Sequence, residues 1–185
     1  MSLSTPDELI AQTKRLVETE KRTELRLRAN GGNSVLLVCP PHLEKECIHS
    51  LTTHFSPGQY QMIDLEELLL EFVETQQADL PELFDMLKGS VEQIFKAPEG
   101  ETGPDLFGNI MAAIQHAFSR NLVPVLIRTG ALYGSGIDSI HIMESSLVMK
   151  ASLPLLLLYP ATRADGQLLF LSRRPASKYR CMIIE

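Results

Sequence analysis

Apolar residues follow two alternating patterns along the chain. In the first they recur every three or four residues, which predicts amphipathic helices; it covers residues 5–28, 43–55, 64–73, 79–95, 106–118 and 138–150. The second consists of short apolar runs of strand length; it covers residues 34–39, 60–63, 123–128, 153–159, 167–171 and 179–184. This alternation predicts a three-layer α/β fold, in which a mostly parallel sheet is flanked by helices on both faces.

The segment boundaries add detail to this fold. Thr5, Asp64 and Asp79 each precede a glutamate by three residues, a spacing that predicts a capping box at the start of a helix. The last two strands are joined by residues 172–178, too few for a crossover helix, so we expect an antiparallel hairpin at one sheet edge. Residues 96–103 form a loop, and no repeat or linker divides the chain. We therefore expect one domain over residues 1–185.

Composition narrows the class of protein. The chain has 185 residues, 44% of them apolar and 22% charged, which is typical of a soluble globular domain. The longest apolar run is far too short to span a membrane, and the first residues lack a basic region followed by an apolar core. Three cysteines form no CxxC pair and lie among apolar residues. We expect a cytoplasmic protein with reduced thiols and no membrane contact.

Charge is distributed unevenly around a net value of −6. Residues 62–105 carry twelve acids and two bases, whereas residues 160–185 are basic. The acids favoured for contact with a basic partner are Glu66, Glu67, Glu71 and Glu74. The bases favoured for contact with nucleic acid are Arg163, Arg173, Arg174, Lys178 and Arg180. The alternative for both groups is a solvated surface that keeps the protein soluble.

The first strand and the helix after it have the layout of a P-loop-like or Rossmann-like nucleotide-binding domain, but the chemistry is missing. No glycine lies between Gly32 and Gly58, and Lys45 is followed by Glu46 instead of serine or threonine. A Walker A loop needs glycines that let backbone N–H groups surround the phosphates, together with a lysine and a hydroxyl. The sequence therefore argues against a conventional ATPase.

A glycine-rich turn at residues 129–138 follows the strand at 123–128, at the end where open α/β sheets bind ligands. A phosphate or nucleotide at this turn is one interpretation, and a loop whose glycines only make turns is the other. The residues that a small ligand would contact come from this turn and from the strands beside it. They are Arg128, Thr129, Gly130, Tyr133, His141, Tyr159, Asp165 and Gly166.

Two groups of side chains have spacings that resemble metal sites. His42, Glu46 and His49 share one helix face, and Asp138, His141 and Glu144 follow a similar spacing. Neither group matches HExxH, and solvated helix faces often carry such trios. The chain also lacks a GxSxG elbow. We predict no metal, no cofactor and no catalytic residue.

The last third of the chain carries an ordered set of motifs. They are Thr129-Gly130-x-x-Tyr133, His141 with Leu147 six residues on, Pro154-Leu155-Leu156-Leu157-Leu158-Tyr159-Pro160, Asp165-Gly166-Gln167-x-Leu169-x-Leu171 and Tyr179-Arg180. In order and spacing this set resembles the BrxB family of the BREX phage-defence systems, over residues 123–184. The resemblance implies a cytoplasmic accessory subunit of a defence module that marks host DNA and blocks phage replication.

The resemblance also implies partners. The neighbours of this family are an alkaline-phosphatase-like protein, a large ATPase and a DNA methyltransferase, and the expected role is protein–protein contact without catalysis. The alternative function is an α/β protein that binds a nucleotide, a phosphate or nucleic acid through residues 128–138 and the C-terminal bases.

Overall fold

The computed structural model describes residues 5–18, 22–98, 100, 105–177 and 179–185. These residues form a seven-stranded sheet, in which five strands run parallel in the order β2-β3-β4-β1-β7. Strand β5 pairs antiparallel with β4, and β6 pairs antiparallel with β5. The strands are β1 (Ser34–Cys39), β2 (Tyr60–Asp64), β3 (Val123–Ile127), β4 (Leu155–Ala164), β5 (Gln167–Phe170), β6 (Arg174–Pro175) and β7 (Met182–Ile184).

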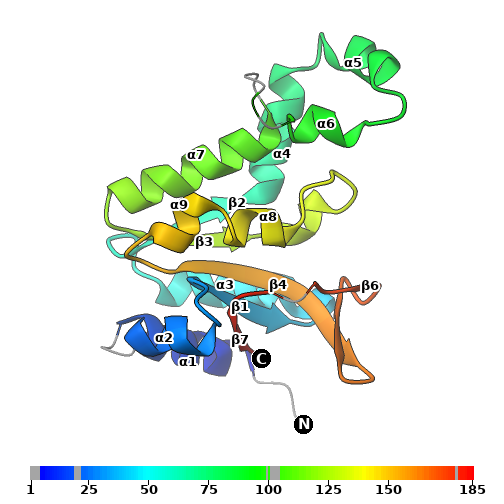
Figure 1. Cartoon of the computed structure of the whole chain (residues 1–185). Coiled ribbons are helices and arrows are strands. Elements are labelled where there is room, and N and C mark those ends of the chain that lie inside the picture. Colours follow the sequence, from blue (N-terminus) through cyan, green and yellow to red (C-terminus); the bar gives the residue numbers. More distant parts are fainter. Residues whose placement is uncertain (1–4, 19–21, 99, 101–104, 178) are drawn as a thin grey trace.

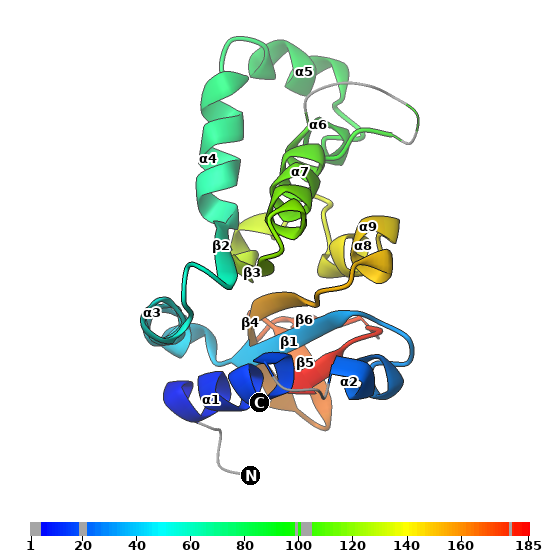
Figure 2. The same ribbon diagram turned by 90° about the vertical axis from the view of Figure 1, so that its left-hand side faces the viewer.

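Helices cover both faces of this sheet, which confirms the predicted three-layer α/β fold (Figures 1 and 2). On one face lie α1 (Pro6–Glu18), α2 (Arg22–Arg28), η1 (Pro41–Leu43) and α3 (Glu44–His54). On the other lie α4 (Leu65–Thr75), α5 (Leu80–Met86), α6 (Glu92–Phe95), α7 (Leu106–Ser119), η2 (Thr129–Leu132), α8 (Ser139–Met143) and α9 (Ser146–Lys150). None of these described helices combines the length and the apolar character needed to cross a membrane.

Strand β1 shows why apolar runs form the centre of the sheet. It lies between β4 and β7, and all six of its residues are buried. Because successive side chains of a strand point to opposite faces, Val35 and Leu37 enter the core under α1–α3, whereas Leu36 and Val38 enter the core under α4–α9. Both faces need apolar residues, so the run is continuous instead of alternating.

Helix starts and breaks differ in part from the expectations. The capping box at α1 is confirmed: the N–H of Thr5 donates to Glu8 Oε2 (2.9 Å), and the N–H of Glu8 donates to Thr5 Oγ1 (3.4 Å). The helix predicted to continue to residue 28 is described at 6–18 and 22–28, and residues 19–21 lie outside the described part. The predicted loop at 96–103 is described only at 96–98 and 100.

Two helices predicted as continuous are interrupted. Residues 79–95 form α5 and α6 around a turn that contains Gly89, because glycine weakens a helix even where the apolar spacing continues. Residues 138–150 form α8 and α9, because Ser145 starts a second helix by accepting a hydrogen bond from the N–H of Val148 (3.3 Å). The cap predicted at Asp79 is wrong, since its side chain accepts no capping hydrogen bond.

The predicted hairpin between the last two strands is also wrong. The hairpin is formed by β4 and β5 around Asp165 and Gly166, which both have positive φ (50° and 78°). Such a two-residue turn matches the twist of antiparallel strands. Strand β7 instead crosses to the opposite sheet edge and pairs parallel with β1.

Helices α4, α5 and α6 rise away from the sheet and form a lobe, which we define as residues 65–95 (Figures 1 and 2). The base of the lobe joins the core through Leu65 and Phe72 of α4. Helix α5, at the far end, contains no fully buried residue. The lobe therefore presents partly exposed apolar side chains away from the rest of the molecule.

Candidate functional site

The carboxyl ends of the parallel strands are the edge where an α/β sheet usually binds ligands. Arg128 follows β3 there, in a left-handed backbone conformation (φ 53°). Its guanidinium donates to the carboxylate of Asp64 at the end of β2, and its Nε lies 3.3 Å from Glu66 Oε2. The one cation expected to hold an anionic ligand is thus already paired with two carboxylates.

A third carboxylate lies near this cluster. Glu44, in the first turn of α3, is half-buried, and its buried Oε1 accepts no hydrogen bond from any described residue. Burial raises the pKa of Glu44, the positive charge of Arg128 opposes this shift, and the charges of Glu66 and Asp64 add to it. An added phosphate would meet three carboxylates around one arginine, which is unfavourable for its binding.

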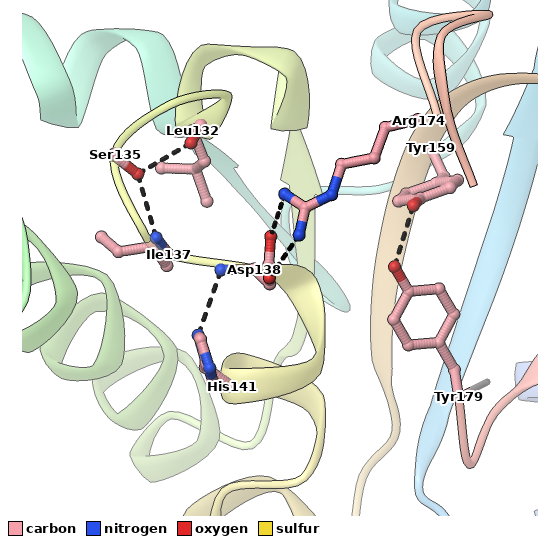
Figure 3. Close-up of polar contacts among 8 residues, drawn as sticks. All are labelled: Leu132, Ser135, Ile137, Asp138, His141, Tyr159, Arg174 and Tyr179. Carbon is pink, nitrogen blue, oxygen red and sulfur yellow. Dashed lines mark hydrogen bonds and ion pairs between the residues drawn. The ribbon is translucent and has the colours of Figure 1, made fainter. Parts of the chain in front are cut away.

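The glycine-rich turn uses its polar groups to fix its own shape (Figure 3). Ser135 Oγ donates to the carbonyl of Leu132 (2.7 Å) and accepts from the N–H of Ile137 (3.2 Å). Buried Thr129 donates to the carbonyl of Leu158 on β4 (2.9 Å). These bonds commit the hydroxyls of Ser135 and Thr129 to the fold of the protein.

Polar groups at the start of α8, directly after this turn, also bind one another or a neighbouring side chain. The N–H of Asp138 donates to Nδ1 of His141 (3.1 Å), so this ring nitrogen acts as an acceptor. Burial and the nearby charge of Lys96 lower the pKa of His141, an effect that Asp138 partly opposes. The carboxylate of Asp138 accepts two hydrogen bonds from Arg174 (2.9 and 3.1 Å), as Figure 3 shows.

Two tyrosines close the remaining space between the turn and the end of β4. The hydroxyls of Tyr159 and Tyr179 are 2.9 Å apart (Figure 3). The ring of Tyr159 also stacks on Phe170, with the ring centroids 4.7 Å apart. Burial and the hydrogen bond to Tyr179 raise the pKa of Tyr159, so its hydroxyl stays protonated. The cavity beside them measures about 20 Å³. That volume holds about one water molecule and no nucleotide.

The structure brings together only part of the predicted ligand set. Thr129, Tyr133 and Tyr159 line the small cavity. Gly130 lies beside Leu171, close enough that a Cβ at Gly130 would be 3.2 Å from its methyl group. Asp165 and Gly166 form the tip of the β4–β5 hairpin and do not line the cavity.

Two of the C-terminal bases predicted to contact nucleic acid are paired with carboxylates of the protein itself. Arg163 binds Glu185 through two hydrogen bonds (2.6 and 3.2 Å), and Arg174 binds Asp138. Arg173 and Arg180 are exposed, and Lys178 lies outside the described residues. The four predicted partner-binding acids lie exposed on α4; among them Glu66 pairs with Arg128. They are Glu66, Glu67, Glu71 and Glu74.

Within the described residues, neither of the two trios whose spacing resembles a metal site is arranged to hold a metal ion. His42, Glu46 and His49 are exposed, and the ring of His141 in the other trio is bonded to the backbone of Asp138. No group of three His, Cys, Asp or Glu side chains in the described part of the chain is arranged to hold a metal ion.

Sequence reasoning missed a larger feature in the lobe. A groove of about 600 Å³ lies along α5 and the segment that follows α6. We call it the lobe groove; its apolar lining consists of Leu83, Met86, Leu87, Ile94, Ala97 and Pro98. The sequence pattern that could have indicated this groove is the spacing of Asp79, Glu82, Leu83 and Met86, which places two acids and two apolar residues on one face of a helix. Apolar spacing alone assigned that face to the core.

These observations define a three-layer α/β protein in which the usual ligand edge is filled by the protein's own ion pairs, while a separate lobe is open. Comparison of the chain with family models, with curated proteins and with solved structures finds no match.

Proposed function

We propose that the protein is a non-catalytic accessory subunit of a BREX-type anti-phage defence system. It acts by protein–protein contacts with other components: the alkaline-phosphatase-like protein, the large ATPase or the DNA methyltransferase. The assignment to a BREX-type system is supported by the motifs at 129–133, 154–160 and 165–171, because they resemble the BrxB family in order and spacing.

The filled ligand edge carries the non-catalytic part of this proposal. Arg128 is paired with Asp64 and Glu66, and the cavity beside Tyr159 has room for about one water molecule. A substrate pocket is usually several hundred Å³ in volume, with a few convergent polar groups. This edge lacks that volume, and its arginine is already paired with carboxylates.

Exposed apolar side chains on the lobe support protein–protein contact. Leu70, Phe84 and Met86 are 56%, 42% and 65% exposed, and all three belong to the same lobe. Apolar groups gathered on a projecting surface are typical of interaction sites, because covering them removes unfavourable contact with water.

The test is purification of the tagged protein, expressed from its own locus in its native host, with mass spectrometry of what remains bound. We expect to recover at least one of the three named components in an amount close to that of the tagged protein. The same component should be absent from two control purifications, one from an untagged strain and one with an unrelated tagged protein of similar charge. Recovery of the protein alone, or with proteins unrelated to defence, would contradict the proposal.

The alternative, a nucleotide, phosphate or nucleic acid at residues 128–138 and the C-terminal bases, has less support from the geometry. A thermal shift assay with a nucleotide panel tests it, because a ligand at about 100 times its Kd stabilises the folded state by roughly 2.7 kcal/mol. Binding of short DNA at low salt, lost as salt rises, is the corresponding test for the bases.

A further inference from the structure

We infer that the lobe groove binds a cationic amphipathic segment of a partner protein, with the apolar side chains of that segment in the groove and its lysines or arginines at the acidic rim. The inference rests on the proposed function, because it names the chemistry of the partner that an accessory subunit would contact. The partner would therefore contact the groove along α5, and not the acids of α4 expected from the sequence.

The floor of the groove is suited to apolar anchors. Leu83 and Leu87 are half-buried against the core of the lobe, whereas Met86 is 65% exposed. A methionine adapts its three rotatable bonds and its polarizable sulfur to different apolar partners. The volume of about 600 Å³ is enough for several side chains of a bound segment.

The rim gives the occupant its charge. Asp79 and Glu82 line the groove and form no ion pair with any described residue. Asp105 also lines it, but this carboxylate accepts hydrogen bonds from the N–H groups of Ala97 (2.7 Å) and Gly108 and so holds the wall in place. Among the described residues, no basic side chain lines the groove.

The bases nearest in sequence are occupied elsewhere. Lys88 pairs with Asp85 at 3.1 Å, and the ammonium of Lys96 lies over the ring of Phe107, 5.4 Å from its centroid. The acids of the rim therefore lack compensation within the lobe, and a positively charged segment is complementary to them. An amphipathic helix in an apolar groove is a common mode of such recognition.

A second groove on the molecule shows what distinguishes the first. It lies between α1 and α3, measures about 660 Å³ and is lined by Asp7, Lys45, Glu46 and His54 among others. Its lining carries charges of both signs, and the described residues that line it include no large apolar side chain. Size alone therefore does not favour the lobe groove; the combination of apolar floor and single-sign rim does.

The test uses a synthetic probe. A fluorescein-labelled helical peptide of about 18 residues, with leucines on one face and lysines beside them, is titrated with the 185-residue protein at about 0.15 M salt. Binding is followed by fluorescence anisotropy. A scrambled peptide of the same composition loses the apolar face and is the control for simple charge attraction. We expect saturable binding of the amphipathic peptide only.

Matched variants assign the binding to the groove. Met86→Ser is expected to raise the Kd about tenfold, and Phe84→Ser, on the same helix but outside the groove, to leave it within about twofold. Neutralising the rim with D79N and E82Q is expected to weaken binding several-fold. The control is the double variant E71Q and E74Q on α4, which removes the same number of negative charges from the lobe outside the groove. Unchanged melting temperatures show that the variants fold.

Each result decides the inference. No saturable binding, an unchanged Kd in Met86→Ser, or equal losses in the two charge variants would overturn it. If the groove variants weaken the peptide but no defence component is recovered from the host, the groove stands and the BREX assignment fails. If a component is recovered and its affinity is the same for Met86→Ser as for wild type, the assignment stands and the groove fails.

Discussion

At the scale of single residues, buried polar side chains bind the backbone of segments that are distant in sequence. Buried Thr129 donates to β4, and Asn33 donates from one amide nitrogen to the carbonyls of Val148, Ala151 and Leu153. An unpaired buried carbonyl costs free energy, so such side chains stabilise loops that lack their own hydrogen bonds. Their role in this protein is to hold the fold.

Asn33→Ala tests this role. The substitution removes three hydrogen bonds, two of them buried, and the carbonyl of Leu153 loses this donor, so we expect the free energy of unfolding to fall by about 2–3 kcal/mol. Urea denaturation measures the change. Asn109→Ala, at an exposed position of α7, is the control and is expected to stay within about 0.5 kcal/mol of wild type. Equal effects at both positions would contradict the assignment.

Glu44 predicts a pH dependence with a definite sign. Because the folded protein raises the pKa of Glu44 above its ordinary value of 4.5, the folded state holds this proton more tightly than the unfolded state does. The carboxyl thus favours folding below pH 4.5, and this contribution is lost as pH rises through the raised folded value. At pH 7 the charged form opposes folding.

The variant Glu44→Gln removes that titration. We expect its melting temperature to exceed that of wild type at pH 7, and the difference to shrink as the pH falls toward 4. Melting curves of both proteins from pH 4 to 8 provide the measurement, with the exposed Glu74→Gln as control. A Glu44→Gln variant less stable than wild type at pH 7 would show that attraction to Arg128 outweighs burial.

At the scale of helices and strands, similar sequences behave differently according to what surrounds them. Asp64 and Asp79 both precede a helix with a glutamate three residues on, yet only Asp64 caps its helix. Its Oδ1 accepts from the N–H groups of Glu66 (3.0 Å) and Glu67 (3.3 Å). Asp64 is the last residue of β2 and has extended backbone, whereas the backbone of Asp79 is already helical. A cap needs the extended conformation.

This contrast predicts different costs for the same substitution. Asp64→Ala is expected to lower the free energy of unfolding by about 1–2 kcal/mol, and Asp79→Ala by less than about 0.5 kcal/mol. Asp64→Asn keeps a capping side chain while it removes the charge next to Arg128, so it separates the cap from the ion pair. Urea denaturation of the three variants is the measurement. A loss at Asp79 as large as that at Asp64 would refute the argument.

Elements that depend on local spacing are predictable from the sequence, whereas contacts between distant segments are not. Strand β1 and the boundaries of α3 follow from local apolar spacing, and both are predicted to within a residue or two. The pairing of β7 with β1 depends on a contact between distant parts of the chain, which spacing does not encode. The ion pair of Arg128 with Asp64, 64 residues away, was inaccessible for the same reason.

At the scale of the whole molecule, the core and the lobe differ in how much they bury. The sheet buries apolar side chains on both faces, whereas α5 contains no fully buried residue and packs through the half-buried side chains of Leu80 and Leu83. Local stability follows the burial of apolar area, and elements that meet partners often come from the less stable end of that range. The lobe is therefore the part of the fold whose stability a partner would change most.

Hydrogen exchange measures this difference directly. We expect the amides of α5 to exchange at least about 100-fold faster than those of β1, because opening seven residues of α5 exposes little apolar surface whereas opening β1 requires global unfolding. Low concentrations of urea should leave exchange in α5 unchanged and accelerate exchange in β1. Addition of the cationic amphipathic peptide should slow exchange in α5 and α6 and leave α3 unaffected. Equal protection of α5 and β1 would mean that the lobe opens only with the core, and its exposed apolar residues would then need another explanation.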